Sequence, residues 1–380
     1  VIVRALGGRG YWPYGCDEVS AICQARKIPL AFLPGDDQPD AELASLSTVN
    51  RDVQHRLWQY LAHGGLGNAL DFIDYSAFII GYDTEWAEPQ PLLRAGLYWP
   101  STPNLDLNSI RSIWAAERPV AVLVFYRALI QSGNLSVINA MVDGLANAGL
   151  NPVPIFVSSL KDPVAAAILE TIMSEVPPSI ILNGTGFSIS APGQERALGP
   201  FEMDTGPMIL QIVFSGGNKE SWLRETRGLG PRDIAMNVAL PEVDGRILTR
   251  AVSFKEGKRR DDLTQTDLIR YEPVEDRIHY VCRLAAAWVF LRQTPISERR
   301  YGLILANYPN RDGRLGNGVG LDTPESVIRL LKAMENKGYR VGDIPVDGQT
   351  LIKRVMAGPT NAFENLDQRM ITETISRDEY

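Results

Sequence analysis

Residues 120–125 read Val-Ala-Val-Leu-Val-Phe, six apolar side chains in a row. A short apolar run without polar alternation is typical of a strand buried on both faces of a parallel sheet. Residues 135–148 follow with helical periodicity, and Gly149 is placed to end that helix. Residues 153–157 are apolar again. The order predicts a strand, a helix and a second strand, the unit from which parallel sheets are built.

The same pattern continues on both sides of this unit. Asp162-Pro163 predicts the start of another helix, and residues 179–182 predict a third strand. The N-terminal third repeats the alternation, with predicted strands at 1–7 and 28–33 and predicted helices at 16–25 and 51–62. We therefore predict an α/β fold, multidomain, with Rossmann-like or flavodoxin-like parallel-sheet modules and long glycine-rich loops.

A second module is predicted near the C-terminus. Residues 301–306 predict a strand, and Asp322-Thr323-Pro324 predicts a helix start. A Gly-Asn pair precedes the helix in both modules. We expect an N-terminal domain at 1–117, a central domain at 118–300 and a truncated module at 301–380. Because residue 1 is valine and residues 370–380 predict a helix without a stop signal, we expect a piece of a longer polypeptide.

Composition excludes several classes of function. The 380 residues carry a net charge of −7, which argues against broad electrostatic binding to nucleic acid or anionic membranes. No apolar stretch reaches the length of a membrane span. The three cysteines and three histidines form no CxxC or HExxH pattern, so a structural zinc site is not expected. The sequence also lacks a Walker motif, so we do not expect ATP hydrolysis on this chain.

Residues 239–246, Ala-Leu-Pro-Glu-Val-Asp-Gly-Arg, form what we call the acid segment. If the segment is extended, Glu242 and Asp244 project to the same side. Two carboxylates at the mouth of a buried strand could bind a divalent cation or accept protons from a ligand. The alternative is a solvated strand end before the turn at Gly245. Spacing alone leaves both open.

Other candidates are weaker. Arg127 follows the 120–125 strand, where it could hold a ligand carboxylate or simply contact a helix or loop. Residues 316–320, Gly-Asn-Gly-Val-Gly, permit close backbone approach to a ligand, but they lack a nucleotide fingerprint. His279 and Cys282 lie three residues apart on a predicted helix at 274–291. Two ligands are too few for a closed metal site, so a packed pair is favoured.

Three long stretches without regular structure are predicted at 183–207, 215–232 and 244–266. Loops of this length are uncommon in compact domains and are usually functional or disordered. The third contains a basic run at 255–260, which we interpret as a solvated or partner-docking loop.

Four segments, in order along the chain, resemble the large-subunit family of aerobic cobaltochelatase. They are FYRALIQSGNLSVINAMVDGL at 125–145, NGTGFSIS at 183–190, RGLGPRDIAMNVALPEVDGRI at 227–247 and ANYPNRDGRLGNGVGLDTPESV at 306–327. That family is similar to the large, porphyrin-binding subunit of magnesium chelatase. The resemblance spans nearly the whole chain, and the family's large subunits are much longer than it.

The resemblance implies a function. The family belongs to an ATP-dependent, cytoplasmic enzyme, a ligase that forms nitrogen–metal bonds. It inserts Co²⁺, the substrate metal, into the corrinoid precursor hydrogenobyrinic acid a,c-diamide during aerobic cobalamin biosynthesis. ATP and Mg²⁺ are bound by partners, an AAA+ ATPase subunit and its accessory subunit, and not by this chain.

The resemblance also implies roles for six residues. Glu242 is carried over as the essential base and metal ligand, and Asp244 as a weaker member of the same catalytic and metal-binding pair. Arg127, Asn183, Thr185 and Asn317 are expected to line the substrate site.

Two other functions remain open. One is a magnesium chelatase subunit, which would act on a porphyrin and Mg²⁺. The other is a non-enzymatic, two-lobed α/β binding protein for an acidic small molecule, which would need neither metal nor partner subunits.

Overall fold

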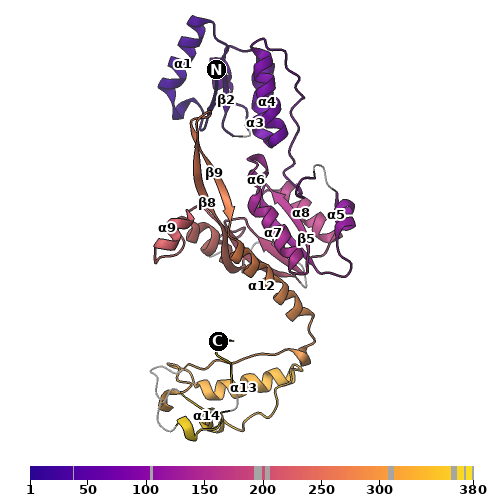
Figure 1. Ribbon diagram of the computed structural model, residues 1–380, viewed down its shortest axis with the longest axis vertical. Helices are drawn as coiled ribbons and strands as arrows, with labels where there is room; N and C mark the ends of the chain where they lie inside the picture. Colours follow the sequence, from indigo (N-terminus) through magenta and orange to yellow (C-terminus); the bar gives the residue numbers. More distant parts are fainter. Residues whose placement is uncertain are drawn as a thin grey trace. The chain divides into compact units, whose positions relative to one another are not determined.

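The computed structural model describes residues 1–36, 38–102, 106–191, 199–201, 206–306, 312–360, 366–371 and 374–378 (Figure 1). The chain divides into two compact units, Val1–Val289 and Phe290–Tyr380. Each is described by itself. The predicted boundaries near residues 117 and 300 stay predictions.

A seven-stranded sheet dominates the described part of the first unit, in the order β3-β5-β4-β6-β7-β8-β9. The strands are β3 (Ala95–Leu97), β4 (Val120–Tyr126), β5 (Asn151–Val157), β6 (Ile180–Asn183), β7 (Met208–Ser215), β8 (Ile247–Asp261) and β9 (Thr266–Pro273). Strands β5, β4, β6, β7 and β8 run parallel, and the edge strands β3 and β9 are antiparallel. The predicted α/β fold is confirmed, and the order of the parallel strands is the flavodoxin-like one.

Strand β4 shows why its sequence is apolar throughout. Its odd-numbered side chains, Ala121, Leu123 and Phe125, pack in one core cluster with α7 (Ser136–Asn147) and α12 (Glu275–Gln293). Its even-numbered side chains, Val122 and Val124, pack in a second cluster with α8 (Pro163–Glu175). Because helices cover both faces, residues 121–125 are all buried, and alternation is lost. The short helices α5 (Leu107–Ile113) and α6 (Ala128–Gln131) flank this core.

The N-terminal part contains a small parallel sheet of β1 (Ile2–Ala5) and β2 (Ala31–Pro34). Helices α1 (Pro13–Arg26), α2 (Ala41–Leu46), α3 (Arg51–His63) and α4 (Leu66–Ile79) accompany it. Core clusters on either side of β2 contain Phe32 and Leu33 respectively. The predicted strands and helices here are confirmed, whereas α2, α4 and β3 were not predicted.

Residues 239–243 of the acid segment are helical, so the extended geometry considered for Glu242 and Asp244 does not occur. Helix α10 (Pro231–Ile234), a π-helical turn (Ala235–Ala239) and α11 (Leu240–Val243) form one continuous helical stretch. Pro241 has no N–H to donate to the carbonyl of residue 237, and the wider π-turn lies just before it. Glu242 and Asp244 therefore do not project together from a strand.

Two of the stretches predicted as irregular contain regular structure. The basic run at 255–260 lies in β8, which pairs with β9 as a hairpin, so the predicted loop is wrong there. The 215–232 stretch contains α9 (Lys219–Arg224) and the start of α10. Residues 184–191 are irregular as predicted, but 192–198 and 202–205 lie outside the described residues.

The second unit contains α13 (Thr323–Asn336), as predicted, and α14 (Gly348–Ala357). Residues 301–306 form no strand, which corrects the predicted second module, and residues 370, 371 and 374–378 are not helical. The other residues of the predicted 370–380 helix lie outside the described residues, as do 307–311 of the fourth family-like segment.

Single 3₁₀ turns lie at Arg9–Tyr11 in the first unit and at Ile296–Glu298, Asp312–Arg314 and Leu366–Gln368 in the second.

Candidate functional site

The candidate site lies at the carboxyl edge of the parallel strands, between β4 and β6. Strand β5, which follows β4 along the chain, lies on one side of β4, and the next strand, β6, lies on the other. In open α/β sheets, ligands bind in the crevice at the carboxyl ends of the strands where the strand order reverses in this way. The chain that leaves β6 stays against β4. Gly184 N donates to Val124 O at 2.8 Å, and the Tyr126 hydroxyl donates to Gly186 O at 3.1 Å.

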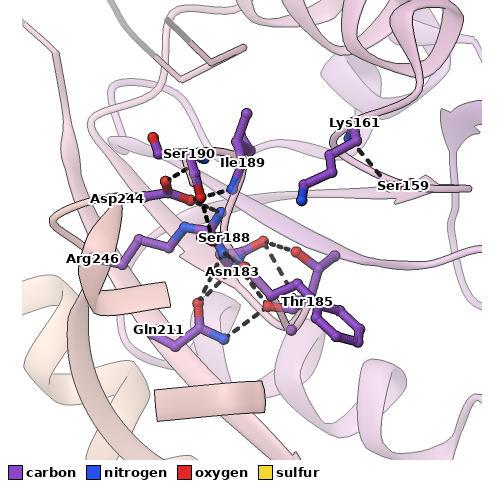
Figure 2. Close-up of polar contacts among 12 residues, drawn as sticks. Ser159, Lys161, Asn183, Thr185, Ser188, Ile189, Ser190, Gln211, Asp244 and Arg246 are labelled. Carbon is purple, nitrogen blue, oxygen red and sulfur yellow. Dashed lines mark hydrogen bonds and ion pairs between the residues drawn. The ribbon is translucent and has the colours of Figure 1, made fainter. Parts of the chain in front are cut away.

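Residues 183–190, which we call the Asn183 loop, are held by a buried amide network (Figure 2). Asn183 Nδ2 donates to Gln211 Oε1 at 2.8 Å and to Thr185 O at 3.0 Å. Thr185 Oγ1 donates to Asn183 Oδ1 at 2.9 Å, and Gln211 Nε2 donates to Thr185 O at 2.9 Å. The side chains of Asn183 and Thr185 are thus engaged in shaping the loop.

Asp244 fastens the acid segment to the same loop. Its Oδ2 accepts from Ile189 N at 2.8 Å and its Oδ1 from Ser190 N at 3.0 Å, while Arg246 Nη2 forms an ion pair with Oδ2 at 2.7 Å (Figure 2). Burial alone would raise the pKa of the Asp244 carboxyl. The two backbone N–H groups and the Arg246 guanidinium outweigh burial and hold that pKa below its ordinary value.

Glu242 has the opposite environment. It lies on α11, two residues before the Asp244 anchor, and its side chain is exposed. The helical stretch that carries it packs closely on the Asn183 loop, since a Cβ on Gly186 would lie 2.8 Å from Asn237 Oδ1 and 3.1 Å from Met236 O. Asp233 adds a further anchor by accepting from Ser215 Oγ at 2.6 Å. The exposed Glu242 carboxylate is therefore carried by a helical stretch that packs on the Asn183 loop and is hydrogen-bonded to the end of β7.

Arg127 lines a separate cavity of about 370 Å³ near the carboxyl ends of β1, β2, β4 and β5. Its wall is formed by strand residues of both sheets and by residues of adjoining helices and turns: Arg4, Gly35, Asp36, Ala62, Tyr126, Arg127, Ala128, Gln131 and Ser158. Burial, together with the nearby Arg127, lowers the pKa of His63. Figure 2 shows Lys161, from the segment after β5, directed toward the space beside the Asn183 loop. The positively charged side chains Arg4, Arg127 and Lys161 thus lie near this edge of the sheet.

The remaining predicted residues lie elsewhere. Asn317 is exposed in the second unit, whose position relative to the sheet is not described. His279 is exposed on α12, whereas Cys282 is fully buried, and burial raises the pKa of its thiol to about 12. A Cβ on Gly144 of α7 would lie 2.9 Å from Cys282 Sγ, so Cys282 packs between two helices. In the described ranges, no three His, Cys, Asp or Glu side chains converge on a metal-sized site.

Sequence reasoning missed Gln211 and Arg246, which are both buried in the network. Gln211 was detectable as a lone polar residue within the apolar run 208–214. Arg246 could have been identified as a cation two residues after Asp244, within the acid segment.

Comparisons with known proteins agree with the four family-like segments. The family model described as CobN/Magnesium Chelatase matches residues 58–380. The chain belongs to this family. Aerobic cobaltochelatase subunit CobN of Sinorhizobium sp is 43% identical over all of this chain, which covers 30% of that protein. Magnesium-chelatase subunit ChlH of Oryza sativa subsp. indica is 25% identical over 89% of the chain and 25% of that protein.

A solved structure supports the same assignment. The catalytic subunit of cobaltochelatase from Mycobacterium tuberculosis superposes with a TM-score of 0.72 at 29% identity, over 94% of this chain and 29% of that one. The chain therefore spans about a third of the length of the relatives it matches. Across the residues that the structure describes, no helix is both long and apolar enough to cross a membrane.

Proposed function

We propose that this chain is part of the tetrapyrrole-binding large subunit of an ATP-dependent cobaltochelatase. The whole enzyme would insert Co²⁺ into hydrogenobyrinic acid a,c-diamide in the cytoplasm, during aerobic cobalamin biosynthesis. An AAA+ ATPase subunit and its accessory subunit would bind ATP and Mg²⁺ and hydrolyse the ATP. Cobalt is favoured over magnesium because identity to the cobaltochelatase relative, 43%, exceeds that to the magnesium chelatase relative, 25%.

The position of Glu242 carries the proposal. Metal insertion releases protons from the ring nitrogens of the macrocycle, so a base must accept them. Hydrated Co²⁺ must also exchange its water ligands, and a carboxylate oxygen can take part in that exchange without the tight hold of a thiolate. An exposed carboxylate two residues before Asp244, which joins this segment to the Asn183 loop, suits both tasks.

Asp244 receives a different role in this proposal. Both of its oxygens accept hydrogen bonds from backbone N–H groups, and one is ion-paired with Arg246. Its negative charge is therefore already balanced by groups of the protein. We assign it to positioning Glu242 and the Asn183 loop. Asn183 and Thr185 would shape the substrate site through the same loop, and Asn317 stays a proposed substrate contact of the second unit.

Arg127 is proposed to bind a carboxylate on the edge of the substrate. A guanidinium can hold a carboxylate with two charge-assisted hydrogen bonds. The cavity that Arg127 lines also contains Arg4, so two cations would share one anionic side arm.

The proposal is tested with Glu242→Gln in the full-length subunit, assayed with both partner subunits, ATP, Co²⁺ and the corrinoid. The substitution keeps the size of the side chain and removes its basicity. We expect the insertion rate to fall about 100-fold or more while corrinoid binding is largely retained. Glu170→Gln, an exposed glutamate on α8, is the matched control. A normal insertion rate in Glu242→Gln would contradict the assignment.

The same assay separates the other functions. A porphyrin with Mg²⁺ replaces the corrinoid with Co²⁺ in a parallel reaction. Faster insertion of magnesium would assign the chain to the magnesium enzyme. Corrinoid binding without insertion under any condition would favour a binding protein.

A further inference from the structure

Phe187 has a backbone conformation that its side chain disfavours. Its φ is +62°, in the left-handed region that bulky residues rarely adopt. The other described non-glycine residues with positive φ are polar: Lys27, Ser101, Glu117 and Gln265. A residue in such a region persists only where its surroundings hold it there, and such residues cluster at binding sites.

The surroundings of Phe187 do hold it. Its N–H donates to Met236 O at 2.7 Å, and its carbonyl accepts from Arg246 Nη1 at 3.3 Å. Further along the loop, the N–H groups of Ile189 and Ser190 donate to the Asp244 carboxylate. The conformation of Phe187 is therefore imposed from both sides by the stretch that also carries Glu242.

Along the Asn183 loop, polar residues are buried and a phenylalanine is exposed, which reverses the usual pattern of burial. The polar residues Asn183, Thr185, Ser188 and Ser190 are buried. Phe187 is the exposed residue of this loop, with 46% of its surface accessible. Folding alone would favour burying Phe187, because removing the apolar surface of an aromatic ring from water stabilises a protein.

We infer that Phe187 is a substrate-binding residue whose ring packs against the flat face of the tetrapyrrole. The inference rests on the proposed function and adds a residue to it. An aromatic ring offers a planar, apolar surface that matches a conjugated macrocycle in shape. Holding the ring outward before binding would also reduce the conformational entropy lost when the ligand arrives.

The test uses the full-length subunit and a visible-absorption titration with hydrogenobyrinic acid a,c-diamide. Phe187→Leu and Phe187→Gly should each weaken binding about five- to ten-fold, whereas Phe187→Tyr should bind like the wild type. Phe78→Leu, an equivalent change at a phenylalanine of α4 that is 51% exposed, is the matched control and should leave affinity unchanged.

Thermal stability separates a binding role from a structural one. Glycine adopts positive φ without strain, so Phe187→Gly should unfold at the same temperature as the wild type or higher. Unchanged affinity in Phe187→Leu, or a marked loss of stability in Phe187→Gly, would overturn the inference while leaving the proposed function intact. Failure of the wild-type subunit to bind the corrinoid would overturn both.

Discussion

Glu242 and Asp244 stand two residues apart, yet one faces water and the other is 7% exposed. The difference arises because α11 ends between them and the chain turns inward at Asp244. There the carboxylate meets two N–H groups and the guanidinium of Arg246, a residue that is only 4% exposed. The end of α11 thus separates a group available for chemistry from a group required for structure.

Removing the charge of Asp244 should be costly. In Asp244→Asn the Arg246 guanidinium loses its ion-pair partner inside the protein, and breaking a buried pair in this way destabilises by about 3–5 kcal/mol. Chemical denaturation of the wild type and the variant measures the difference. Asp244→Asn combined with Arg246→Met should recover part of the loss. No recovery would mean that the contacts to Ile189 and Ser190 dominate.

At the scale of the element, α8 depends on one N-terminal cap. Asp162 Oδ1 accepts from Val164 N at 3.0 Å, and Oδ2 accepts from Arg94 Nη1 at 2.8 Å and Ser158 Oγ at 2.7 Å. The Arg94 hydrogen bond, followed by that of Ser158, lowers the pKa of the Asp162 carboxyl to about 2. The cap joins α8 to the segment after β5 and to the irregular segment directly before β3.

The lowered pKa gives a signed pH dependence. The folded protein holds the Asp162 proton less tightly than the unfolded chain, so the cap contributes fully above the ordinary value of 3.8 and is lost as pH falls toward 2. Asp162→Ala should lower the free energy of unfolding by about 1–2 kcal/mol at neutral pH. The difference from wild type should shrink on acidification, as followed by denaturation at several pH values. A difference independent of pH would contradict the assigned cause.

At the scale of the whole molecule, the described part of this chain offers no complete metal site. Glu242 is a single exposed carboxylate, and no three potential ligands converge among the described residues. We therefore expect calorimetric titration of the 380-residue chain with Co²⁺ alone to show no site tighter than about 0.1 mM, the weak end of carboxylate cation sites. A tight, saturable site would show that the metal binds before the macrocycle and without the rest of the subunit.

Much of the fold could be predicted from local sequence. Residues 120–125 predicted a strand covered on both faces, and Asp162-Pro163 and Asp322-Thr323-Pro324 predicted two helix starts, because burial and capping leave short-range patterns. Residues 301–306 are as apolar as a strand yet form none in the structure. An apolar run becomes a strand only where a neighbouring strand pairs with it, and the sequence does not report that pairing.

The acid segment shows the same division at the candidate site. Its residue types alone pointed to Glu242 and Asp244, and the four family-like segments pointed to the family. Whether those carboxylates act together could not be read from their spacing, because spacing has a geometric meaning only once the segment is known to be strand or helix. Tertiary structure set that choice: Arg246 and two N–H groups from the Asn183 loop draw Asp244 inward, and Glu242 is left exposed.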